Sequence, residues 1–316
     1  MRIILAPMEG LLDFRLREIL TQIGGYDECV SEFIRVNDTL LPPHRFFRTA
    51  PELKNSSRTK SDTPVKIQIL GSDPNRMADN AHLVASLGAY GIDINFGCPA
   101  PTVNRNRGGA ALLKEPNLMY SIVKAVRNVV PENIPVTAKM RLGYESTELA
   151  LDCAKALEEG GAKEIVVHAR TKTDGYKPPA YWEWIAKIKS ILKINVIANG
   201  EIWTVQDAIQ CQKISGCDDI MIGRGAVTNP SIALLIKKKL EERMSWQKTK
   251  EVLSSYWLSM EPDVEAVSRV GRIKQWLHYL SREYEEAQID FQKIKRISNP
   301  KDFELIYFSE LFSQIK

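Results

Sequence analysis

Three residues in short polar segments could carry acid–base or electrostatic chemistry. Cys98 lies in the run Asn-Phe-Gly-Cys-Pro, where a thiol in a polar setting can donate a proton and the following proline fixes the turn. Lys139 ends an otherwise apolar run, so its ammonium could stabilise negative charge that develops in a site. His168 could contact a phosphate or a base. An acid, a cation and an imidazole are therefore the first candidate site residues.

Each of these side chains also has a structural alternative. A buried cysteine is only a small hydrophobe, Lys139 could pair with Glu9 or Asp93, and His168 could be a structural histidine. Gln68 could hydrogen-bond the edge of a ligand, or it could merely satisfy the backbone at the end of a strand. The residues taken singly leave these alternatives open.

Two glycine-bearing turns, Asn199-Gly200 and Gly223-Arg224-Gly225, are candidates for a phosphate site. Glycine lets backbone N–H groups approach a phosphate closely, although it serves an ordinary tight turn equally well. A phosphate held there would belong to a phosphorylated substrate or to a cofactor such as FMN.

Strand-like and helix-like stretches must position these segments, and they alternate along the chain. The expected strands are residues 3–5, 29–34, 65–69, 91–95, 136–140, 164–168, 195–198 and 219–222. The expected helices between them include residues 76–87, 118–129, 147–159, 182–192 and 205–214. Eight such strands predict an α/β fold, a (β/α)8 TIM barrel, with an open doubly wound sheet as the competing topology. The Rossmann glycine fingerprint is absent after the first strand, where Pro-Met-Glu-Gly stands instead.

The carboxyl ends of barrel strands meet at one rim, and this is where barrel enzymes build their sites. The polar residues at the expected strand ends are Glu9, Arg35, Gln68, Asn95, Cys98, Lys139, Arg141, His168, Asn199, Glu201 and Arg224. Such a convergence of ionisable groups is unexpected in a purely structural protein.

From residue 245 onward only helical periodicity remains. We therefore expect a catalytic barrel over residues 1–243 and a small all-helical domain over residues 244–316. Arg269, Arg272, Trp276 and Tyr279 recur at helical spacing in this second region, beside an apolar face. Arginine and aromatic residues on one stripe suit contact with RNA, while packing of this helix on the barrel is the alternative.

Composition narrows the classes of protein that remain. The 316 residues carry a formal net charge of +4 and are 44% hydrophobic, which excludes a histone-like tail or an acidic disordered chain. The five cysteines form no Cys-x-x-Cys pair, so we expect neither a disulfide scaffold nor a metal site. No segment predicts a signal peptide or a membrane span. We expect a cytoplasmic monomer that does not bind a membrane.

Six segments in order resemble the tRNA-dihydrouridine synthases, and the match runs from residue 1 to about residue 300. They are Ala6-Pro7-Met8-Glu9-Gly10, Asn95-Phe96-Gly97-Cys98-Pro99, Lys139-Met140-Arg141-Leu142-Gly143, His168-Ala169-Arg170-Thr171, Asn199-Gly200-Glu201 and Gly223-Arg224-Gly225. Arg35 and the run Arg272–Leu277 are most similar to the bacterial subfamily C, which acts on uridine 16 of the D-loop. The combination is specific, although single segments such as Pro-Met are not.

The resemblance implies an FMN-dependent enzyme, reduced by NADPH, that converts uridine in tRNA to dihydrouridine. It implies that Cys98 protonates C5 of uracil, while hydride passes from the flavin to C6. The residues implied to bind the cofactor are Pro7, Met8, Glu9, Gln68, Lys139, His168, Asn199, Gly200, Glu201, Gly223 and Arg224. The residues implied to hold the base or orient the tRNA are Asn95, Arg35, Arg141, Arg272, Lys274, Tyr279 and Lys295.

The chemistry of the residues is consistent with that assignment. The C5–C6 bond of uracil accepts hydride poorly unless C5 is protonated as negative charge develops, and a thiol is an acid of suitable strength. Three rival functions remain. The chain could be a flavoprotein acting on free pyrimidines, similar to dihydroorotate dehydrogenase. It could also be an RNA-binding protein without catalysis, or a phosphosugar enzyme that uses the phosphate turns without flavin.

Overall fold

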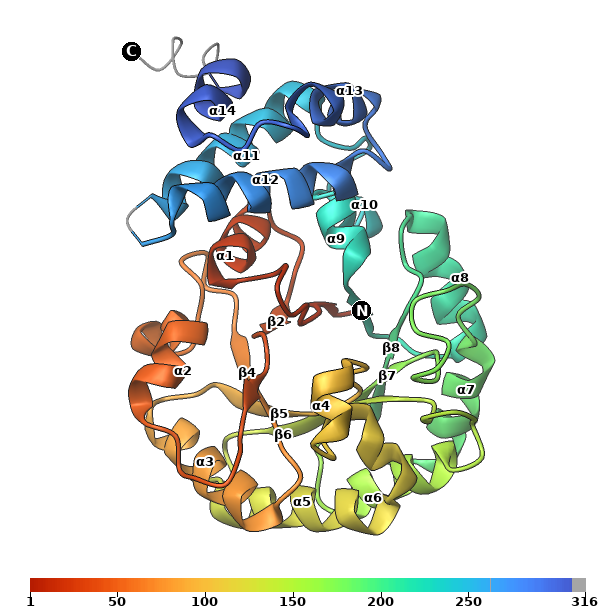
Figure 1. Ribbon diagram of the computed structural model, residues 1–316. Helices are drawn as coiled ribbons and strands as arrows, with labels where there is room; N and C mark the ends of the chain where they lie inside the picture. Colours follow the sequence, from red (N-terminus) through yellow and green to blue (C-terminus); the bar gives the residue numbers. More distant parts are fainter. Residues whose placement is uncertain (262, 309–316) are drawn as a thin grey trace.

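The strands of the computed structural model, which describes residues 1–261 and 263–308, form one closed parallel barrel (Figure 1). They are β1 (Ile3–Leu5), β2 (Glu28–Val30), β3 (Ile34–Arg35), β4 (Val65–Leu70), β5 (Gly91–Phe96), β6 (Val136–Arg141), β7 (Glu164–His168), β8 (Asn195–Asn199) and β9 (Ile220–Ile222). The sheet order is β2-β1-β9-β8-β7-β6-β5-β4-β3, and β2 also pairs with β4, which closes the ring. The predicted barrel is therefore confirmed and the open sheet is excluded.

One predicted strand is wrong in detail. The expected strand over residues 29–34 is two short strands, β2 and β3, which pair with the beginning and the end of β4 and together occupy one place in the barrel. The chain turns between them because Ser31 and Glu32 use their side chains elsewhere. The hydroxyl of Ser31 accepts the backbone N–H of Gln68 at 3.0 Å, and the carboxylate of Glu32 accepts the N–H of Gly10 at 2.6 Å.

Helices cover the outside of the barrel. They are α1 (Phe14–Ile23), α2 (Pro43–Thr49), α3 (Pro74–Ser86), α5 (Pro116–Val129), α6 (Ala150–Glu159), α7 (Trp182–Ile191) and α8 (Val205–Ser215). Shorter helices, α4 (Pro101–Arg105), α9 (Arg224–Thr228) and α10 (Ile232–Ile236), lie in the loops, with 3-10 turns at Pro51–Asn55 and Gly109–Lys114. Local signals set the ends: Asp73 caps α3 ahead of Pro74, and Thr204 and Asp207 form a capping box at α8.

The strands have two faces because successive side chains point to opposite sides. Alternate residues of β4, such as Val65 and Ile67, join the main core between sheet and helices, whereas Lys66 and Gln68 between them face the lumen. A separate small apolar cluster fills one side of the lumen: Ile4, Ala6, Val30, Val166, Ile197 and Met221. The lumen is therefore apolar on one side and polar along β4, β5 and β6.

Buried charges close the end of the barrel where the strands begin. The ammonium of Lys66 lies 2.7 Å from Glu28 and 2.6 Å from Glu164, and the guanidinium of Arg2 lies 2.6 Å from Glu164 and 2.8 Å from Asp219. We call these five residues the base cluster. Burial opposes ionisation of Glu164, but the charge of Lys66 and hydrogen bonds from Arg2 and Lys66 outweigh it and lower the pKa of Glu164. Each charge in the cluster thus has a partner of opposite sign.

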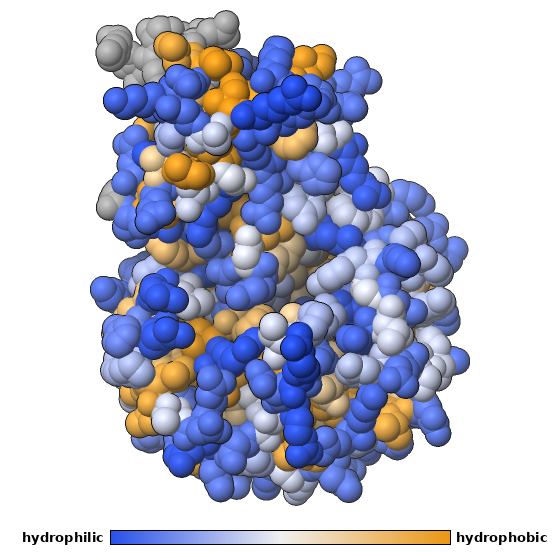
Figure 2. Space-filling view, viewed as in Figure 1, coloured by the Kyte–Doolittle hydropathy of each residue, from blue (hydrophilic) through white to orange (hydrophobic). Residues whose placement is uncertain are grey.

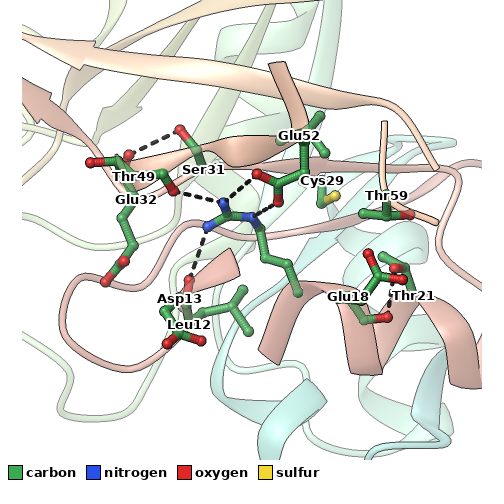
Figure 3. Close-up of polar contacts among 12 residues, drawn as sticks. Leu12, Asp13, Glu18, Thr21, Cys29, Ser31, Glu32, Thr49, Glu52 and Thr59 are labelled. Carbon is green, nitrogen blue, oxygen red and sulfur yellow. Dashed lines mark hydrogen bonds and ion pairs between the residues drawn. The ribbon is translucent and has the colours of Figure 1, made fainter. Parts of the chain in front are cut away.

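A fully buried arginine anchors the loop between β1 and α1, which carries Pro7, Met8 and Glu9. Arg17 donates to both carboxylate oxygens of Glu52 at 3.0 and 3.2 Å, and to the carbonyls of Thr49 and Leu12. Figure 3 shows Glu52, Thr49 and Leu12 around this guanidinium. Because the bond to Leu12 reaches into the loop itself, the packing of α1 fixes where the loop enters the barrel mouth.

Four helices follow residue 243 in the described part of the chain: α11 (Trp246–Met260), α12 (Ala266–Leu280), α13 (Glu285–Ile294) and α14 (Pro300–Tyr307). Figure 1 shows them stacked beyond α1 and α9. The proposed domain division at residues 243 and 244 falls between α10 and α11, and residues 309–316 of the proposed second domain lie outside the described residues. In the described residues no helix is long and apolar enough to cross a membrane.

The predicted RNA-binding stripe of α12 is largely a packing surface. Trp276 is fully buried and donates its indole N–H to the carbonyl of Val227 at 2.9 Å. The guanidinium of Arg269 lies over the ring of Trp257, and that of Arg272 forms an ion pair with Asp13. Stacking of a base on Trp276 is therefore excluded. Trp276 and Arg272 pack on the barrel, as the alternative predicted, whereas Arg269 packs on α11 of the C-terminal helices. Contact of Arg272 with tRNA stays a prediction.

Candidate active site

A cavity of about 650 Å³ opens at the ends of the strands, and it lies where Figure 2 shows a hollow between the barrel and the C-terminal helices. This volume is within the usual range for ligand sites. All residues proposed to bind the cofactor line it: Pro7, Met8, Glu9, Gln68, Lys139, His168, Asn199, Gly200, Glu201, Gly223 and Arg224. Cys98, Asn95, Arg141 and Tyr279 also line it. The tertiary structure thus brings together loops that are far apart in the sequence.

Cys98 lies in the loop directly after β5, at the edge of this cavity. The amide oxygen of Asn95 accepts the backbone N–H groups of Gly97 and Cys98, both at 2.9 Å, and the carbonyl of Cys98 accepts from Asn104 and Ala110, both at 3.0 Å. These bonds hold the loop on both sides of the thiol. Cys98 is partly exposed, whereas the other four cysteines are buried.

The Cys98 thiol is held in its protonated form. Burial is the largest influence and raises its pKa. The N–H of Ala100 opposes it, the charge of Glu9 raises the pKa again, and Arg141 and Arg35 lower it by less. A thiol with a raised pKa is a proton donor at neutral pH rather than a nucleophilic thiolate. The geometry therefore suits an acid.

Lys139 projects from β6 into the cavity. Within the described residues, its ammonium donates one hydrogen bond, to the side-chain oxygen of Asn199 at 3.1 Å. Burial lowers the pKa of Lys139 to about 8, Arg141 contributes in the same direction, and Asp93 opposes them. Because the ammonium is not neutralised by a direct ion pair with Glu9 or Asp93 in the described residues, an anion in the cavity would find a buried cation there.

His168, the last residue of β7, is a neutral imidazole. Burial lowers its pKa well below the ordinary value, and the surrounding charges of Arg141, Lys139, Arg170 and Arg224 lower it further. Its ring lies against Gly200, where a Cβ atom would come within 2.9 Å of the imidazole Cδ2 atom. The turn after β8 can therefore approach the ring closely only because residue 200 has no side chain.

Two arginines share one carboxylate beside the turns after β8 and β9. Oε1 of Glu201 lies 3.0 Å from Arg170 and 3.2 Å from Arg224. The guanidinium of Arg170 is fully buried, and its Nη1 atom has no hydrogen-bond partner in the described residues. Positive charge therefore exceeds negative charge at this side of the cavity.

Sequence reasoning did not identify an arginine–aromatic stack at the mouth. Arg141 and Arg224 lie 5.1 and 4.8 Å from the ring centroid of Tyr176, and Arg224 and Arg282 lie 4.7 and 3.9 Å from that of Trp203. Tyr176 is 53% exposed. An exposed aromatic residue in a polar loop after a barrel strand was the available signal for it, whereas only the tertiary structure brings Arg282 to Trp203.

The residues proposed to orient tRNA are placed unequally. Asn95, Arg141 and Tyr279 line the cavity, and Arg35 lies at the end of β3, where its charge acts on Glu9 and Cys98. The remaining residues lie on the C-terminal helices away from the lining: Arg272, Lys274 and Lys295. Lys274 donates to the backbone carbonyl of Lys295 at 3.0 Å, so these two cations are neighbours. Arg272 is instead tied to Asp13.

The cavity fits a phosphate-bearing flavin. It has the volume for a ligand of drug-like size, three cations in its wall, Lys139, Arg141 and Arg224, and glycine turns at Gly200 and Gly223 where backbone groups can approach a phosphate. Arg224 and the turn at Gly223 would hold the phosphate, and Lys139 would lie beside the ring. Among the described residues there is no group of three or more His, Cys, Asp or Glu side chains that could hold a metal ion.

Comparison with known proteins places this geometry in context. The family model described as dihydrouridine synthase matches residues 4–311. The chain is 54% identical over 300 residues to the tRNA-dihydrouridine(16) synthase of Pseudomonas syringae pv. tomato, covering 94% of this chain and 95% of that protein. It is 47% identical over 307 residues to the enzyme of that name from Haemophilus influenzae, covering 96% and 98%.

Two solved structures share the fold at low identity. A 2-naphthoyl-CoA reductase complex matches with a TM-score of 0.57 at 14% identity, over 76% of this chain and 50% of that chain. An old yellow enzyme homologue from Zymomonas mobilis matches with a TM-score of 0.53 at 12% identity, over 78% and 91%. At these identities the two structures support the barrel fold alone.

Proposed function

Since the chain belongs to the dihydrouridine synthase family of flavin-dependent oxidoreductases, we propose that it reduces uridine to 5,6-dihydrouridine at position 16 in the D-loop of tRNA. FMN is the proposed flavin and NADPH the proposed reductant. The observation that carries the proposal is the position of the Cys98 thiol at the edge of a cavity lined by Lys139, Arg141 and Arg224. The names of the relatives support position 16.

The residues of the cavity have separable roles in this reaction. A reduced flavin held in the cavity beside Lys139, with its phosphate at Arg224 and the Gly223 turn, would supply the hydride for C6 of the uracil. Cys98 donates its proton to C5, the other carbon of the double bond, and this prevents negative charge from accumulating on C5. The two additions together saturate the C5–C6 bond. The Cys98 thiolate left behind is less stable than the thiol in this buried setting, so it regains a proton readily.

Lys139 and His168 supply a polarised environment without taking part in the proton transfer. The ammonium of Lys139 stabilises negative charge in the cavity, and its lowered pKa keeps it protonated only up to about pH 8. The neutral imidazole of His168 can donate one hydrogen bond and accept another, whereas an imidazolium would add a fifth positive charge to its surroundings.

The substrate must present an extruded base, because the cavity lies inside the barrel mouth. The arginine–aromatic stack of Arg141, Tyr176, Arg224, Trp203 and Arg282 stands beside the entrance and offers both charge and flat rings. Lys274 and Lys295 form a second pair of cations on the C-terminal helices. Phosphate contacts of this kind supply affinity and register, while contacts in the cavity select the base.

The test is position-resolved mapping of dihydrouridine in tRNA from cells that lack this protein. Loss at position 16 that is restored by the wild type and not by Cys98→Ala would support substrate, position and acid together. Loss at another position would retain the reaction and overturn the assigned position. Intact dihydrouridine everywhere, with activity of the purified protein on free uracil or dihydroorotate, would replace the proposal with a flavoprotein of free pyrimidines.

A further inference from the structure

A row of polar side chains crosses the lumen of the barrel one layer below the active-site cavity. Gln68 of β4, Asp93 of β5 and Thr137 of β6 are neighbours in strand register, Gln68 opposite Asp93 and Asp93 opposite Thr137. All three are at most 1% exposed. Asp93 is therefore a buried acidic residue that does not line the cavity itself and is hydrogen-bonded to the lining residue Gln68.

Hydrogen bonds join this row to the Cys98 loop. Thr137 and Gln68 each donate to Asp93, at 2.6 and 2.7 Å, one to each carboxylate oxygen. The amide of Asn95 then donates to the side-chain oxygen of Gln68 at 2.8 Å. The oxygen of Asn95 in turn accepts the backbone N–H groups that precede and include Cys98. One unbroken chain of bonds thus runs from Asp93 to the thiol loop.

Asp93 sets the donor-to-acceptor direction of this series of hydrogen bonds. Asp93 accepts a hydrogen bond on the oxygen that faces Gln68, so Gln68 must turn its NH₂ group inward. The Gln68 oxygen must then face Asn95, which requires Asn95 to donate its NH₂ group and leaves its oxygen for the loop. If either amide were reversed, an NH₂ group would face the N–H donors of Gly97 and Cys98 and the cap would be lost. The side-chain amides of Gln68 and Asn95 could each adopt two orientations, and these hydrogen bonds allow only one for each.

We propose that Asp93 is a positioning residue for the reaction, which fixes the Cys98 loop through the amides of Gln68 and Asn95. The inference rests on the proposed function, because it takes Cys98 to be the acid. It assigns to Gln68 a role in this chain in addition to its place in the cavity lining. The physical requirement at position 93 is a hydrogen-bond acceptor facing Gln68, since an acceptor alone is enough to orient the amide.

Three variants separate this role from simple packing. Asp93→Leu keeps the number and branching of the side-chain heavy atoms but has no acceptor, so both amides lose their preferred orientation. Asp93→Asn can keep its oxygen toward Gln68 and donate its NH₂ group to the hydroxyl of Thr137, so it should retain the chain. Thr137→Val is the matched control, because it removes a buried hydrogen bond to Asp93 while leaving the bond from Gln68 intact.

The flavin-loaded enzyme is measured in two ways. Steady-state kinetics on tRNA give kcat and KM, and the rate of alkylation by iodoacetamide across pH reports on Cys98, with Cys98→Ala giving the background from the four buried cysteines. For Asp93→Leu we expect kcat to fall about 10- to 100-fold with KM within about threefold, and the alkylation rate to change by about threefold or more. Asp93→Asn and Thr137→Val should stay within about threefold of wild type in both assays.

The outcomes decide the proposal separately from the proposed function. Wild-type values for Asp93→Leu, or an equal loss in Asp93→Asn, would overturn it, the latter because charge rather than orientation would then matter. If Asp93→Leu does not fold, Asp93→Ala is measured instead. If neither variant folds while Asp93→Asn does, the role of Asp93 is in stability, and the positioning role is overturned. Alkylation needs no substrate, so it still tests the chain of bonds if the wild type fails to reduce tRNA uridine.

Discussion

The two ends of the barrel use buried charge in opposite ways. At the end where the strands begin, Lys66 and Arg2 are matched by Glu28, Glu164 and Asp219. At the mouth, Lys139, Arg141, Arg170 and Arg224 surround His168, and Glu201 is the carboxylate that pairs with two of these arginines. In the first arrangement each cation is paired with two carboxylates, whereas the cations of the second have capacity for an anion.

This difference indicates that the paired charges at the base stabilise the fold, whereas the cations at the mouth serve ligand binding. A buried charge that loses its partner is costly, so the base cluster should tolerate substitution poorly. At the mouth, burial lowers the pKa values of Lys139, Arg141 and Arg224, which is a cost that a bound anion would relieve. Substitutions at the two ends should therefore affect different measurements.

The largest effect is expected at the mouth, on activity alone. Cys98→Ala should lower kcat by about 100- to 10,000-fold, because general acid catalysis contributes a factor of this order. Flavin content, tRNA binding and the melting temperature should remain near wild type, since the side chain is partly exposed and small. Single-turnover reduction of tRNA checks this. Undiminished turnover would remove Cys98 from the role of acid.

The next effect is expected at the base cluster, on stability alone. Lys66→Met should lower the free energy of unfolding by about 3–5 kcal/mol, because it leaves Glu28 and Glu164 buried without their shared cation. Urea unfolding measures it. The matched control is Lys248→Met, which breaks an exposed pair with Glu251 and should cost less than about 1 kcal/mol. Equal effects of the two variants would contradict the contrast between the ends.

As the pH falls, the contribution of the mouth to the free energy of unfolding should be lost at a higher pH than that of the base cluster. The folded pKa of His168 lies below its unfolded value of about 6.5, so the unfolded chain binds the proton more tightly and stability is lost as the pH falls below that value. The pKa of Glu164 is also lowered, but its contribution is lost only below about pH 4.5. We expect His168→Gln to flatten the decline in unfolding free energy between pH 6.5 and 5. A decline unchanged in that variant would assign it to other groups.

The smallest effect is expected on the C-terminal helices, in the salt dependence of tRNA binding. Lys274→Gln with Lys295→Gln should reduce the slope of log K against log salt by about one for each tRNA phosphate that is no longer neutralised, because fewer counterions are released. Arg272→Gln should instead lower the melting temperature, since Arg272 is paired with Asp13. Binding titrations between low and moderate salt measure the slope. An unchanged slope in the double variant would remove the two lysines from the interface.

Much of the site could be predicted because it depends on local order along the chain. The polar residues of the site stand at or just after the ends of the strands, and in a closed parallel barrel every such end meets the others. The residues proposed for the cofactor therefore all reached one cavity. The polar row below it had a sequence signal as well, because polar residues alternate with apolar ones in Val65–Leu70, Gly91–Phe96 and Val136–Arg141. That alternation predicts a polar lumen, although not its bonds.

What the sequence determined by itself was the barrel, the order of its strands and the set of side chains delivered to the mouth. Only the tertiary structure decided which of those side chains face the cavity and which are paired with another residue of the protein. Arg272 meets Asp13 across 259 positions of sequence, and Trp276 is covered by a region around Val227. The physical reason is that periodicity specifies which face of an element is buried, whereas the partner of a charge or a ring depends on which distant element packs against that face.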